Sequence, residues 1–596
     1  MLSTMDPFQK SFFVFLFIAI LAFAFYIRVD HFERWLHFEL DQARDAIVID
    51  EGFEGDFWDL PLLGPKAGGT FLRLAPAFYY FEYVSGLIFG QKPSGIAFFI
   101  PILGVCLLPL LYLLFRRVHS AWESLGLMAL ASVSMYMVLY ARFAWNPNLL
   151  PFFLTLGFYA LLRAVPVDEK YRTVWFLVAT FALMLATQMH FLAFLAVPII
   201  VAVFLLLKRA RFSWQAWTGA VAIIIFLSLP VILNELRTGG ANTGEFFAAI
   251  TEKSTKEQHN LIEKGIRDVS EFGLASVVIL TGSERATFPN VLVNAQAWGT
   301  VCDAKCDKGK LLGILGVLFF LLGTVSLCVG WWRARDRQVS DFYLLAMIWL
   351  GVSFILYLPL AYAVAPRFYL LSAPLFFIML GSIYTNIIPG AGKIKHGAFA
   401  LLIIILIILN YLYLDQRYTE LVKAPFNPVE SAPDRVLKER TRVTLEQQTI
   451  ISYFLRERYR ETGKVLYLTS EPQYKRALKY MLEREHIPMS GFNATNLYRE
   501  GLYYLVLRTG GNIETNYAKY LDRFDVIQVT QFGTLSLVEL RPKEEFIVGD
   551  RQDLNVPAKE AISKAPPRYT WREFFTPGAG EFSEDEVESE ITTDAN

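Results

Sequence analysis

Acidic side chains follow the first apolar segment closely, in the stretch Phe38-Glu39-Leu40-Asp41-Gln42-Ala43-Arg44-Asp45. Carboxylates so close to a bilayer are costly unless they face water or take part in chemistry. Asp41 and Asp45 are four residues apart, so on a helix they share one face. A carboxylate held there could act as a general base toward a hydroxyl or an amine. The alternative role of both is structural, and for Asp41 it is an ion pair with Arg44 or Arg34.

Further polar candidates lie beyond this acidic stretch. Lys66 and Arg73 flank a glycine-rich segment whose backbone can approach a ligand closely, and either cation could bind a phosphate. The alternative is an ordinary loop with its lysine among lipid headgroups. Arg142 and Asn146 follow the third apolar segment. An arginine at that depth needs a headgroup or an anion as partner, and an asparagine can hydrogen-bond a sugar.

Two later junctions add to the candidates. His190 lies where one apolar segment ends and the next begins, as a structural or a ligand-binding group. Arg367 and Tyr369 open a late apolar segment, where Arg367 could neutralise a phosphodiester or extend to the headgroup layer. The candidates come from distant parts of the chain yet share one predicted depth. We therefore predict an outer-leaflet site for an anionic lipid, built from Asp41, Arg73, Arg142, His190 and Arg367.

The composition indicates that a membrane domain positions these residues. The chain has 596 residues, is 54% hydrophobic and has a mean hydropathy of +0.37, more apolar than a soluble protein. A net charge of zero gives no case for nucleic acid. The first apolar run lacks a small-residue cleavage site, so we expect a retained helix. About eleven spans are predicted, at 11–29, 96–115, 121–141, 148–164, 173–190, 191–207, 215–233, 311–331, 341–361, 368–388 and 397–414.

Basic residues recur in alternate short loops, at 116–117, 163–172, 208–211, 333–337 and 393–395. The positive-inside rule puts these loops and the amino terminus in the cytoplasm. The loops 30–95 and 234–310 and everything after 414 are then outside. Thr70–Gly90 is apolar enough to span, but a span there would reverse every later loop. We therefore predict an aromatic interfacial helix at that position.

Beyond the last span, helical and strand patterns alternate. Helices are predicted at 444–462 and 473–485, and strands at 465–469, 502–507, 526–530 and 535–540. The predicted fold is an all-α polytopic membrane domain with interfacial helices (1–414), followed by an extramembrane α/β domain (415–575). The acidic tail, 576–596, is predicted to be disordered.

Four cysteines are present, and they fall in two settings. Cys302 and Cys306 lie in a polar loop, where they could form a disulfide outside the cytoplasm. A zinc site is the weaker alternative, because no histidines lie nearby. Cys106 and Cys328 lie within apolar runs and are expected to be inert packing.

The order of these motifs resembles that of the C-type (GT-C) integral membrane glycosyltransferases. The likeness is to the branch of the protein O-mannosyltransferases and lipid A aminoarabinose transferases, and it runs from about residue 10 to 390. The matching elements are the acidic motif, a Leu-Leu-Gly loop, an aromatic interfacial helix, an arginine pair after the second span and an Arg-Phe-Tyr element, at 41–46, 62–64, 87–90, 116–117 and 367–369.

The resemblance implies transfer of a sugar from a polyprenyl-phosphate-linked donor to an acceptor outside the cytoplasm, usually with inversion. Asp41 would be the base, and Arg73, His190 and Arg367 would hold the lipid phosphate. Three positions depart from the family: Gln42 replaces a common glutamate, Asn146-Pro147 a common aspartate and His190 a common lysine. The first two departures weaken the case for a divalent metal, so no cofactor is predicted with support from the motif.

Other functions stay open at this point. A lipid-linked oligosaccharide ligase or polymerase with a diphosphate donor would need a larger basic site than the outer loops offer. A flippase would need charged or broken helices at mid-membrane, and most predicted spans are clean. An inactive scaffold remains possible because of Gln42 and Asn146. The expected partners are the lipid-linked donor, a lipid, glycan or protein acceptor, and membrane lipid. The expected location is the plasma or inner membrane, with the site and the C-terminal domain extracytoplasmic.

Overall fold

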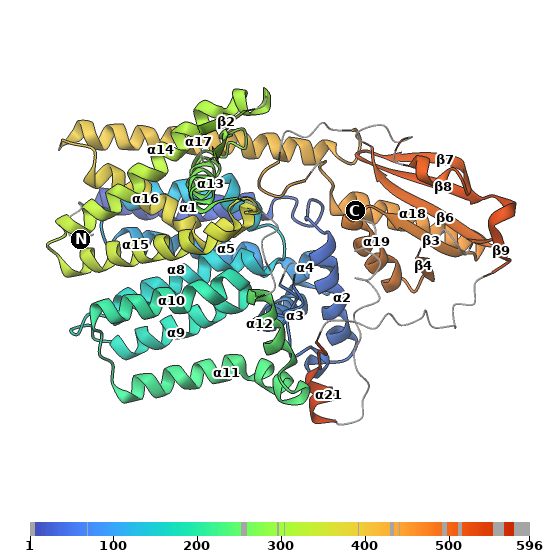
Figure 1. The fold of residues 1–596 in the computed structure, drawn as a ribbon, viewed down its shortest axis with the longest axis horizontal. Coiled ribbons are helices and arrows are strands. Elements are labelled where there is room, and N and C mark those ends of the chain that lie inside the picture. Colours follow the sequence, from blue (N-terminus) through green and yellow to red (C-terminus); the bar gives the residue numbers. More distant parts are fainter. Residues whose placement is uncertain are drawn as a thin grey trace.

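A computed structural model of the protein describes residues 6–67, 70–251, 259–294, 297–302, 304–390, 392–428, 434–439, 441–491, 497–509, 515, 517–551 and 566–576. Figure 1 shows a block of helices lying side by side, with a sheet-containing domain at one end. The predicted disordered tail beyond residue 576 lies outside the described residues.

The helical block contains most of the chain. Its helices and 3-10 turns are α1 (Pro7–Val29), α2 (Leu40–Glu54), η2 (Phe57–Asp59), α3 (Ala77–Phe89), α4 (Pro93–Ala97), α5 (Phe99–Phe115), α6 (Ala121–Val133), α7 (Met135–Tyr140), η3 (Asn146–Leu149), α8 (Leu150–Ala164), α9 (Arg172–Met189), α10 (Phe191–Lys208), α11 (Trp214–Thr238), α12 (Ala241–Thr251), α13 (Leu261–Thr281), α14 (Ala304–Arg333), α15 (Arg337–Tyr357), η4 (Leu358–Leu360), η5 (Pro366–Leu371), α16 (Ala373–Asn386) and α17 (Lys393–Lys423).

Within the described residues, eight helices are long and apolar enough to cross a membrane. They are Pro7–Val29, Pro93–Phe115, Arg172–Met189, Phe191–Lys208, Trp214–Thr238, Cys306–Arg333, Arg337–Leu360 and Lys393–Lys423. The other three predicted spans are also helical, but α8 has only 15 residues and the other two are interrupted. The third is split at Ser134, whose hydroxyl donates to the Ile279 carbonyl while the next backbone N–H donates to Asn410 Oδ1. The polytopic helical fold is confirmed, whereas the count of eleven stays a prediction.

Two regions differ from the structure predicted for them. The predicted interfacial helix is only the 13 residues of α3, about 20 Å long, too short to span a bilayer. The region 234–310, expected to be a loop, contains α12, α13 and the hairpin of β1 (Asn290–Asn294) and β2 (Ala297–Val301). Helix α13 begins with a capping box between Asn260 and Glu263 and buries one apolar side against α14.

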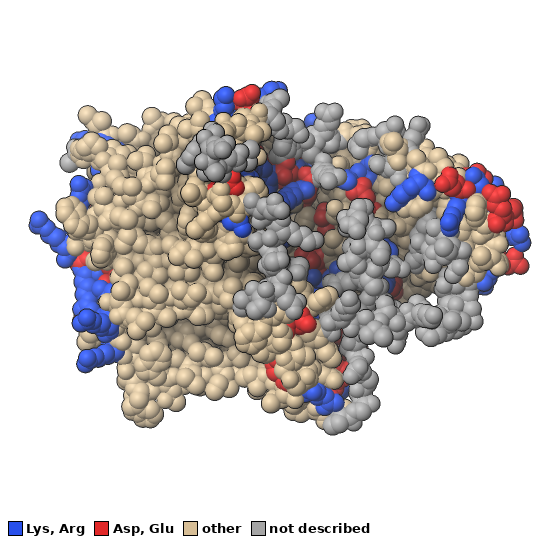
Figure 2. Space-filling view, in the orientation of Figure 1, with Lys and Arg blue, Asp and Glu red and all other residues tan. Residues whose placement is uncertain are grey.

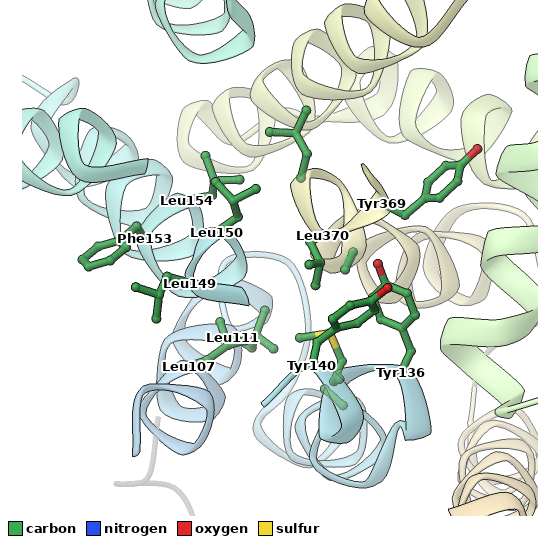
Figure 3. Close-up of a cluster of buried hydrophobic side chains, with 14 of the residues drawn as sticks. Leu107, Leu111, Tyr136, Tyr140, Leu149, Leu150, Phe153, Leu154, Tyr369 and Leu370 are labelled. Carbon is green, nitrogen blue, oxygen red and sulfur yellow. The ribbon is translucent and has the colours of Figure 1, made fainter. Parts of the chain in front are cut away.

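The short segments that hold candidate residues share one core. Figure 3 shows Leu149 and Leu150 on one side and Leu370 of η5 on the other, with Tyr136 and Tyr140 below them. The hydroxyl of Tyr136 donates to the Pro366 carbonyl. Because this core is close-packed, η3 and η5 are fixed relative to one another.

The C-terminal domain is the small α/β layer predicted from the sequence. Its elements are α18 (Leu445–Thr462), β3 (Val465–Ser470), α19 (Pro472–Arg484), β4 (Met489–Gly491), β5 (Leu497–Tyr498), β6 (Gly501–Arg508), η6 (Ala518–Tyr520), β7 (Phe524–Phe532), β8 (Leu535–Pro542), η7 (Glu544–Phe546) and β9 (Ile547–Gly549). The last helix, α21 (Trp571–Phe575), lies against the helical block instead. The main sheet has the order β4-β3-β6-β8-β7. Strand β3 is parallel to β4 and β6, and β8 is antiparallel to β6 and β7. Alternate strand residues pack under α18 and α19, which cover one face.

A buried ion network joins this domain to the membrane domain. Helix α17 continues past its predicted end at 414 and carries Arg417 into the network. Arg417 contacts Asp434 at 2.9 Å and Glu439 at 2.6 Å. Arg442 contacts the same two carboxylates at 2.7 and 3.0 Å, and Glu420 at 2.9 Å. Both guanidinium groups lower the pKa of Asp434 against the effect of its burial.

The cysteines fall into the two groups expected. Cys302 and Cys306 form a disulfide, with their Cα atoms 5.3 Å apart. Cys106 and Cys328 are exposed on the outside of α5 and α14, so the expectation that they are packed inside is wrong. Their small apolar side chains suit the lipid-facing side of a span.

Lysine and arginine gather at the end of the helical block opposite the sheet domain (Figure 2). That end holds the short basic loops between the spans, including the one between α10 and α11 and the one between α14 and α15. The two ends of the block therefore differ in charge.

We expect Arg442→Met to destabilise the attachment of the C-terminal domain. Removing one partner from a buried ion network typically costs about 3–5 kcal/mol, because the remaining charges lose their compensation. The variant should melt at a lower temperature in detergent and be cleaved faster by protease between 424 and 444. Arg460→Met, on the exposed side of α18, is the control and should behave as the wild type. Equal melting of both variants would contradict the role given to the network.

Candidate functional site

Helix α2 places Asp41 in its first turn. Glu39 is the N-cap, and the backbone N–H of Glu39 donates to Gln42 Oε1 at 3.2 Å in a capping box. Gln42, which departs from the family pattern, therefore has a local structural role. Asp41 lies at the end of the helix where the backbone dipole favours negative charge.

Two donors hold the Asp41 carboxylate. Arg44 Nη1 donates to Oδ1 at 3.0 Å, and the indole Nε1 of Trp145 donates to Oδ2 at 3.1 Å. The Asp41 side chain is still 42% exposed. It is an oriented carboxylate with one side open to a ligand, as a general base requires.

Asp45 lies behind this carboxylate and does not share its exposure. Its side chain is fully buried, and Oδ1 accepts from Arg44 Nε at 2.9 Å and Nη2 at 2.7 Å. The expected catalytic role of Asp45 is therefore replaced by one of holding Arg44. Glu82 of α3 is buried beside the pair, where burial and the charge of Asp45 raise the pKa of Glu82 well above its usual range.

Trp145 connects the acid to a cation from a distant part of the chain. The guanidinium of Arg367 lies 5.4 Å from the centre of the Trp145 ring and 5.5 Å from that of Phe368. Arg367 is exposed, and no carboxylate among the described residues forms an ion pair with it. The indole of Trp145 thus contacts both the acid Asp41 and the cation Arg367.

His190 adjoins this cation. Its Nδ1 accepts from the backbone N–H of Leu192 at 3.1 Å, so the proton of the neutral ring is on Nε2. Burial and the charge of Arg367 lower the pKa of His190 to about 4. The imidazole is therefore neutral at physiological pH, and its ring packs against Phe368 with 5.6 Å between centroids. Arg367 and His190 together offer a charge and a neutral donor to an anion.

Lys66 and Arg73 face each other across an antiparallel bridge. The hairpin that carries them is closed by bonds from Gly64 N to Leu74 O and from Ala67 N to Leu72 O, both 2.7 Å. A side chain at Gly64 would meet the carbonyl oxygen of Ala75 at 2.4 Å, so the close approach requires glycine. The tip residues 68–69 lie outside the described residues.

Helix α12 ties this hairpin to the His190 junction. Asn242 accepts from the Arg73 backbone N–H at 2.8 Å and donates to the Arg73 carbonyl at 3.1 Å. Phe246, one turn on, packs against Phe191, the neighbour of His190 in sequence. The hairpin therefore lies on the His190 side of the site.

Three expected substrate-binding residues are buried in the protein. Arg142 is buried and donates to the carbonyls of Ile27 and Asp30 and to the Tyr418 hydroxyl, at 2.8, 2.7 and 3.0 Å. It caps the end of α1, a correction to its predicted role. Tyr369 is also corrected, because its side chain is buried against Phe272 and points away from Leu370 (Figure 3). Asn146 is buried at the start of η3, next to Trp145 in sequence.

A possible metal site lies near the start of α2. His37, Glu39 and Glu439 offer ligand atoms within 4.8 Å of one another. Burial alone would lower the pKa of His37, but Glu39 and Glu439 raise it to about 9. The ring is then protonated at neutral pH and donates to Glu439 at 2.9 Å. Both nitrogens of that imidazolium carry protons, so a metal ion would have to displace one of them; without a metal the three residues form an ion cluster.

Two residues of the site were not among the sequence candidates. Trp145 lies in an aromatic stretch typical of a membrane surface, and nothing in the sequence signals its bond to Asp41. Glu82 had a visible signal, since it is the only charged residue of the apolar helix α3.

Comparison with known proteins matches part of the chain to a family and most of the chain to a known fold. Residues 74–233 match the family Dolichyl-phosphate-mannose-protein mannosyltransferase. The chain is similar to the crystal structure of ArnT from Cupriavidus metallidurans bound to undecaprenyl phosphate, with 12% identity, a TM-score of 0.52 and coverage of 88% of this chain and 97% of that chain. It is also similar to the apo oligosaccharyltransferase of Archaeoglobus fulgidus, with 13% identity, a TM-score of 0.47 and coverage of 87% and 71%. No curated protein sequence matches the chain.

The His37 cluster gives a testable pH dependence. Because the pKa of His37 is raised in the folded state, its stabilisation is complete below about pH 6.5 and is lost as the pH rises through about 9. We expect His37→Gln to cost about 2–3 kcal/mol at pH 7 and much less at pH 10. Thermal unfolding in detergent across this range measures the difference. The control is His31→Asn, since asparagine tolerates the positive φ of 48° there. A cost of His37→Gln that is independent of pH would refute the assignment.

Proposed function

We propose, from the GT-C glycosyltransferase fold of this chain and its matching mannosyltransferase segment, that it moves a sugar from a polyprenyl-phosphate-linked donor to an acceptor. The observation that carries the proposal is the contact of Asp41 and Arg367 with the same indole, Trp145. One group accepts a proton and the other binds an anion. Sugar transfer from a lipid phosphate needs both within the length of one sugar.

Asp41 is the proposed general base. It takes the proton of the acceptor hydroxyl or amine as that group attacks the anomeric carbon of the sugar. The new bond forms as the bond from the anomeric carbon to the phosphate oxygen breaks, and the electron pair leaves with polyprenyl phosphate. A single displacement of this kind inverts the anomeric centre. Arg44 and Trp145 orient Asp41, and Asp45 in turn fixes Arg44.

The donor phosphate is proposed to lie against Arg367 and His190. The exposed guanidinium supplies charge, and the neutral imidazole supplies an N–H on Nε2. Lys66 and Arg73 extend this anion site from the hairpin. Such groups stabilise the charge that grows on the leaving phosphate, at about 3–4 kcal/mol per well-placed donor. Arg142 and Tyr369 have no part in this proposal, because their contacts are with the protein.

The active site is proposed to face the extracytoplasmic side of the membrane. Two observations support this orientation. The basic loops gather at the end of the helices away from the C-terminal domain (Figure 2), and they favour the cytoplasm. The Cys302–Cys306 disulfide is typical of an oxidising compartment. The C-terminal domain, which contacts α2 through α19, is then placed to select a lipid, glycan or protein acceptor.

The base is tested with Asp41→Asn, which preserves shape and removes the basic oxygen. We expect kcat to fall by about 10²–10⁴-fold, with donor KM changed only a few-fold, when membranes are given labelled polyprenyl-phosphate sugars. The matched control is Glu54→Gln, at the exposed end of the same helix, which should transfer sugar at the wild-type rate. Undiminished transfer by Asp41→Asn would remove Asp41 from the mechanism.

The anion site is tested with Arg367→Gln. A hydrogen bond to a charged group is worth about 1.5–3 kcal/mol, so the affinity for polyprenyl phosphate should fall roughly 10- to 100-fold. The control is Arg34→Gln, an exposed arginine 4.0 Å from Glu446, which should leave the affinity unchanged. Binding is measured by titrating the purified protein with polyprenyl phosphate in detergent. Equal affinities of the two variants would place the phosphate elsewhere.

A further inference from the structure

The last described segment of the chain, residues 566–576, leaves the C-terminal domain and returns to the membrane domain. We call it the C-terminal strap. It contains α21, which lies beside the end of α11 and away from the sheet that precedes it in the sequence (Figure 1). The residues between β9 and the strap, from 552 to 565, lie outside the described residues.

The strap pairs with the backbone of the first outer loop. Thr570 forms an isolated antiparallel bridge with Pro61. The Leu62 N–H donates to the Tyr569 carbonyl at 2.8 Å, and the Trp571 N–H donates to the Leu60 carbonyl at 3.2 Å. The strap thus supplies main-chain partners to a loop that has no sheet of its own.

Side chains of the first two residues of α21 reinforce this pairing. Arg572 forms ion pairs with Asp56 at 3.0 Å and Asp59 at 2.5 Å. The indole N–H of Trp571 donates to the Tyr80 hydroxyl at 2.9 Å. These two residues bind opposite ends of the segment that runs from η2 to α3.

The strap is also anchored to the end of a span. Asn234 of α11 donates to the Pro567 carbonyl at 3.3 Å and accepts from the Tyr569 N–H at 3.0 Å. The guanidinium of Arg237 lies 5.0 Å from the centre of the Tyr569 ring. The strap therefore bridges α11 and the first outer loop.

The held segment runs directly into the hairpin of Lys66 and Arg73. Leu62 is two residues before Gly64, where the hairpin is closed by its bond to Leu74. We call residues 60–67 and 70–74 the anion loop. Arg568 of the strap lies 6.0 Å from the centre of the Tyr79 ring, on the helix that follows this loop. The strap thus adjoins the first end of the anion loop directly and also contacts the helix that follows its second end.

We propose that the C-terminal strap is a positioning element of the donor site, acting through Trp571 and Arg572 to hold the anion loop. The proposal rests on the function proposed above. Hairpin bonds and Asn242 hold this loop from Gly64 onward, but residues 60–63 would sample many conformations without the strap, and ordering them on binding would reduce donor affinity. With the strap in place, that ordering is complete before the donor arrives. The strap touches neither the acid Asp41 nor Arg367, so its loss changes donor binding and leaves the displacement step intact.

The test is Arg572→Ala in the full chain. Its matched control is Arg499→Ala, another exposed arginine that pairs with two carboxylates, Glu544 and Asp550, but lies in the sheet domain. We expect Arg572→Ala to raise donor KM, and the Kd for polyprenyl phosphate alone, about tenfold, with kcat within twofold of the wild type. Arg499→Ala should change none of these. Trp571→Ala is a second variant and should act in the same direction.

Hydrogen exchange separates positioning from general destabilisation. We expect Arg572→Ala to raise exchange in the anion loop and to leave α18 and α19 unchanged. Faster exchange in the anion loop with an unchanged Kd for polyprenyl phosphate would overturn the proposal. A loss of kcat at constant donor KM would overturn it as well. Exchange and affinity that both match the wild type would overturn it too. If Arg572→Ala weakens the binding of polyprenyl phosphate as expected but the wild type transfers no sugar, the function proposed above fails and the strap assignment stands.

Discussion

Two buried guanidinium groups, Arg417 and Arg442, share the carboxylates of Asp434 and Glu439 where the last long helix meets the C-terminal domain. Taking four charges out of water is costly, and the cost is offset only while every charge keeps its partners. Glu439 also accepts from His37, three residues before α2 begins to carry the candidate acid. The network therefore sets the position of α2 as well as that of the domain. Its geometry connects the end of the membrane domain to the first turn of the helix that holds Asp41.

Around Asp41 the charges are arranged unevenly. Arg44 is shared by an exposed carboxylate, Asp41, and a buried one, Asp45. Burial of Glu82 beside them favours its neutral form, so the buried side of the cluster carries one negative charge against one positive charge. Asp41 is then the carboxylate whose charge faces the open side. The neutral His190 and the exposed Arg367 belong to the other half of the site, where negative charge is expected from a ligand.

The sequence was sufficient to predict those parts of the fold whose residue pattern is compatible with one kind of structure only. Apolar runs predicted the helical block, and alternating residues predicted β3, β6, β7 and β8 of the sheet. The shared predicted depth in the membrane suggested that Asp41 and Arg367 lie near each other, although they are far apart in the chain. It could not supply Trp145, because an indole that joins an acid to a cation has the same local sequence as one that anchors a membrane surface.

The shared predicted depth did not identify the role of candidates whose partners are backbone atoms or buried side chains. Arg142 has the right depth, yet its donors go to carbonyl oxygens at the end of α1, and such acceptors carry no signature in the sequence. Tyr369 neighbours Arg367 but enters an aromatic cluster, because successive residues of a 3-10 turn face different sides. The strap was missed for a further reason. The acids that pair with Arg572 lie in an acidic part of the first outer loop, and their partner lies more than 500 residues later in the chain.

That separation has a consequence for how the molecule is made. The pairing of Arg572 with Asp59 joins residues 513 positions apart, so the first outer loop is synthesised long before its clamp. At about 5–20 residues per second, ribosomes need about 25–100 s to cover that interval. During this time the nascent loop has already emerged and waits without its final partners. Completion of the anion loop is thereby tied to translation of residues 566–576, and a chain cut short before them would insert into the bilayer without the partners of that loop.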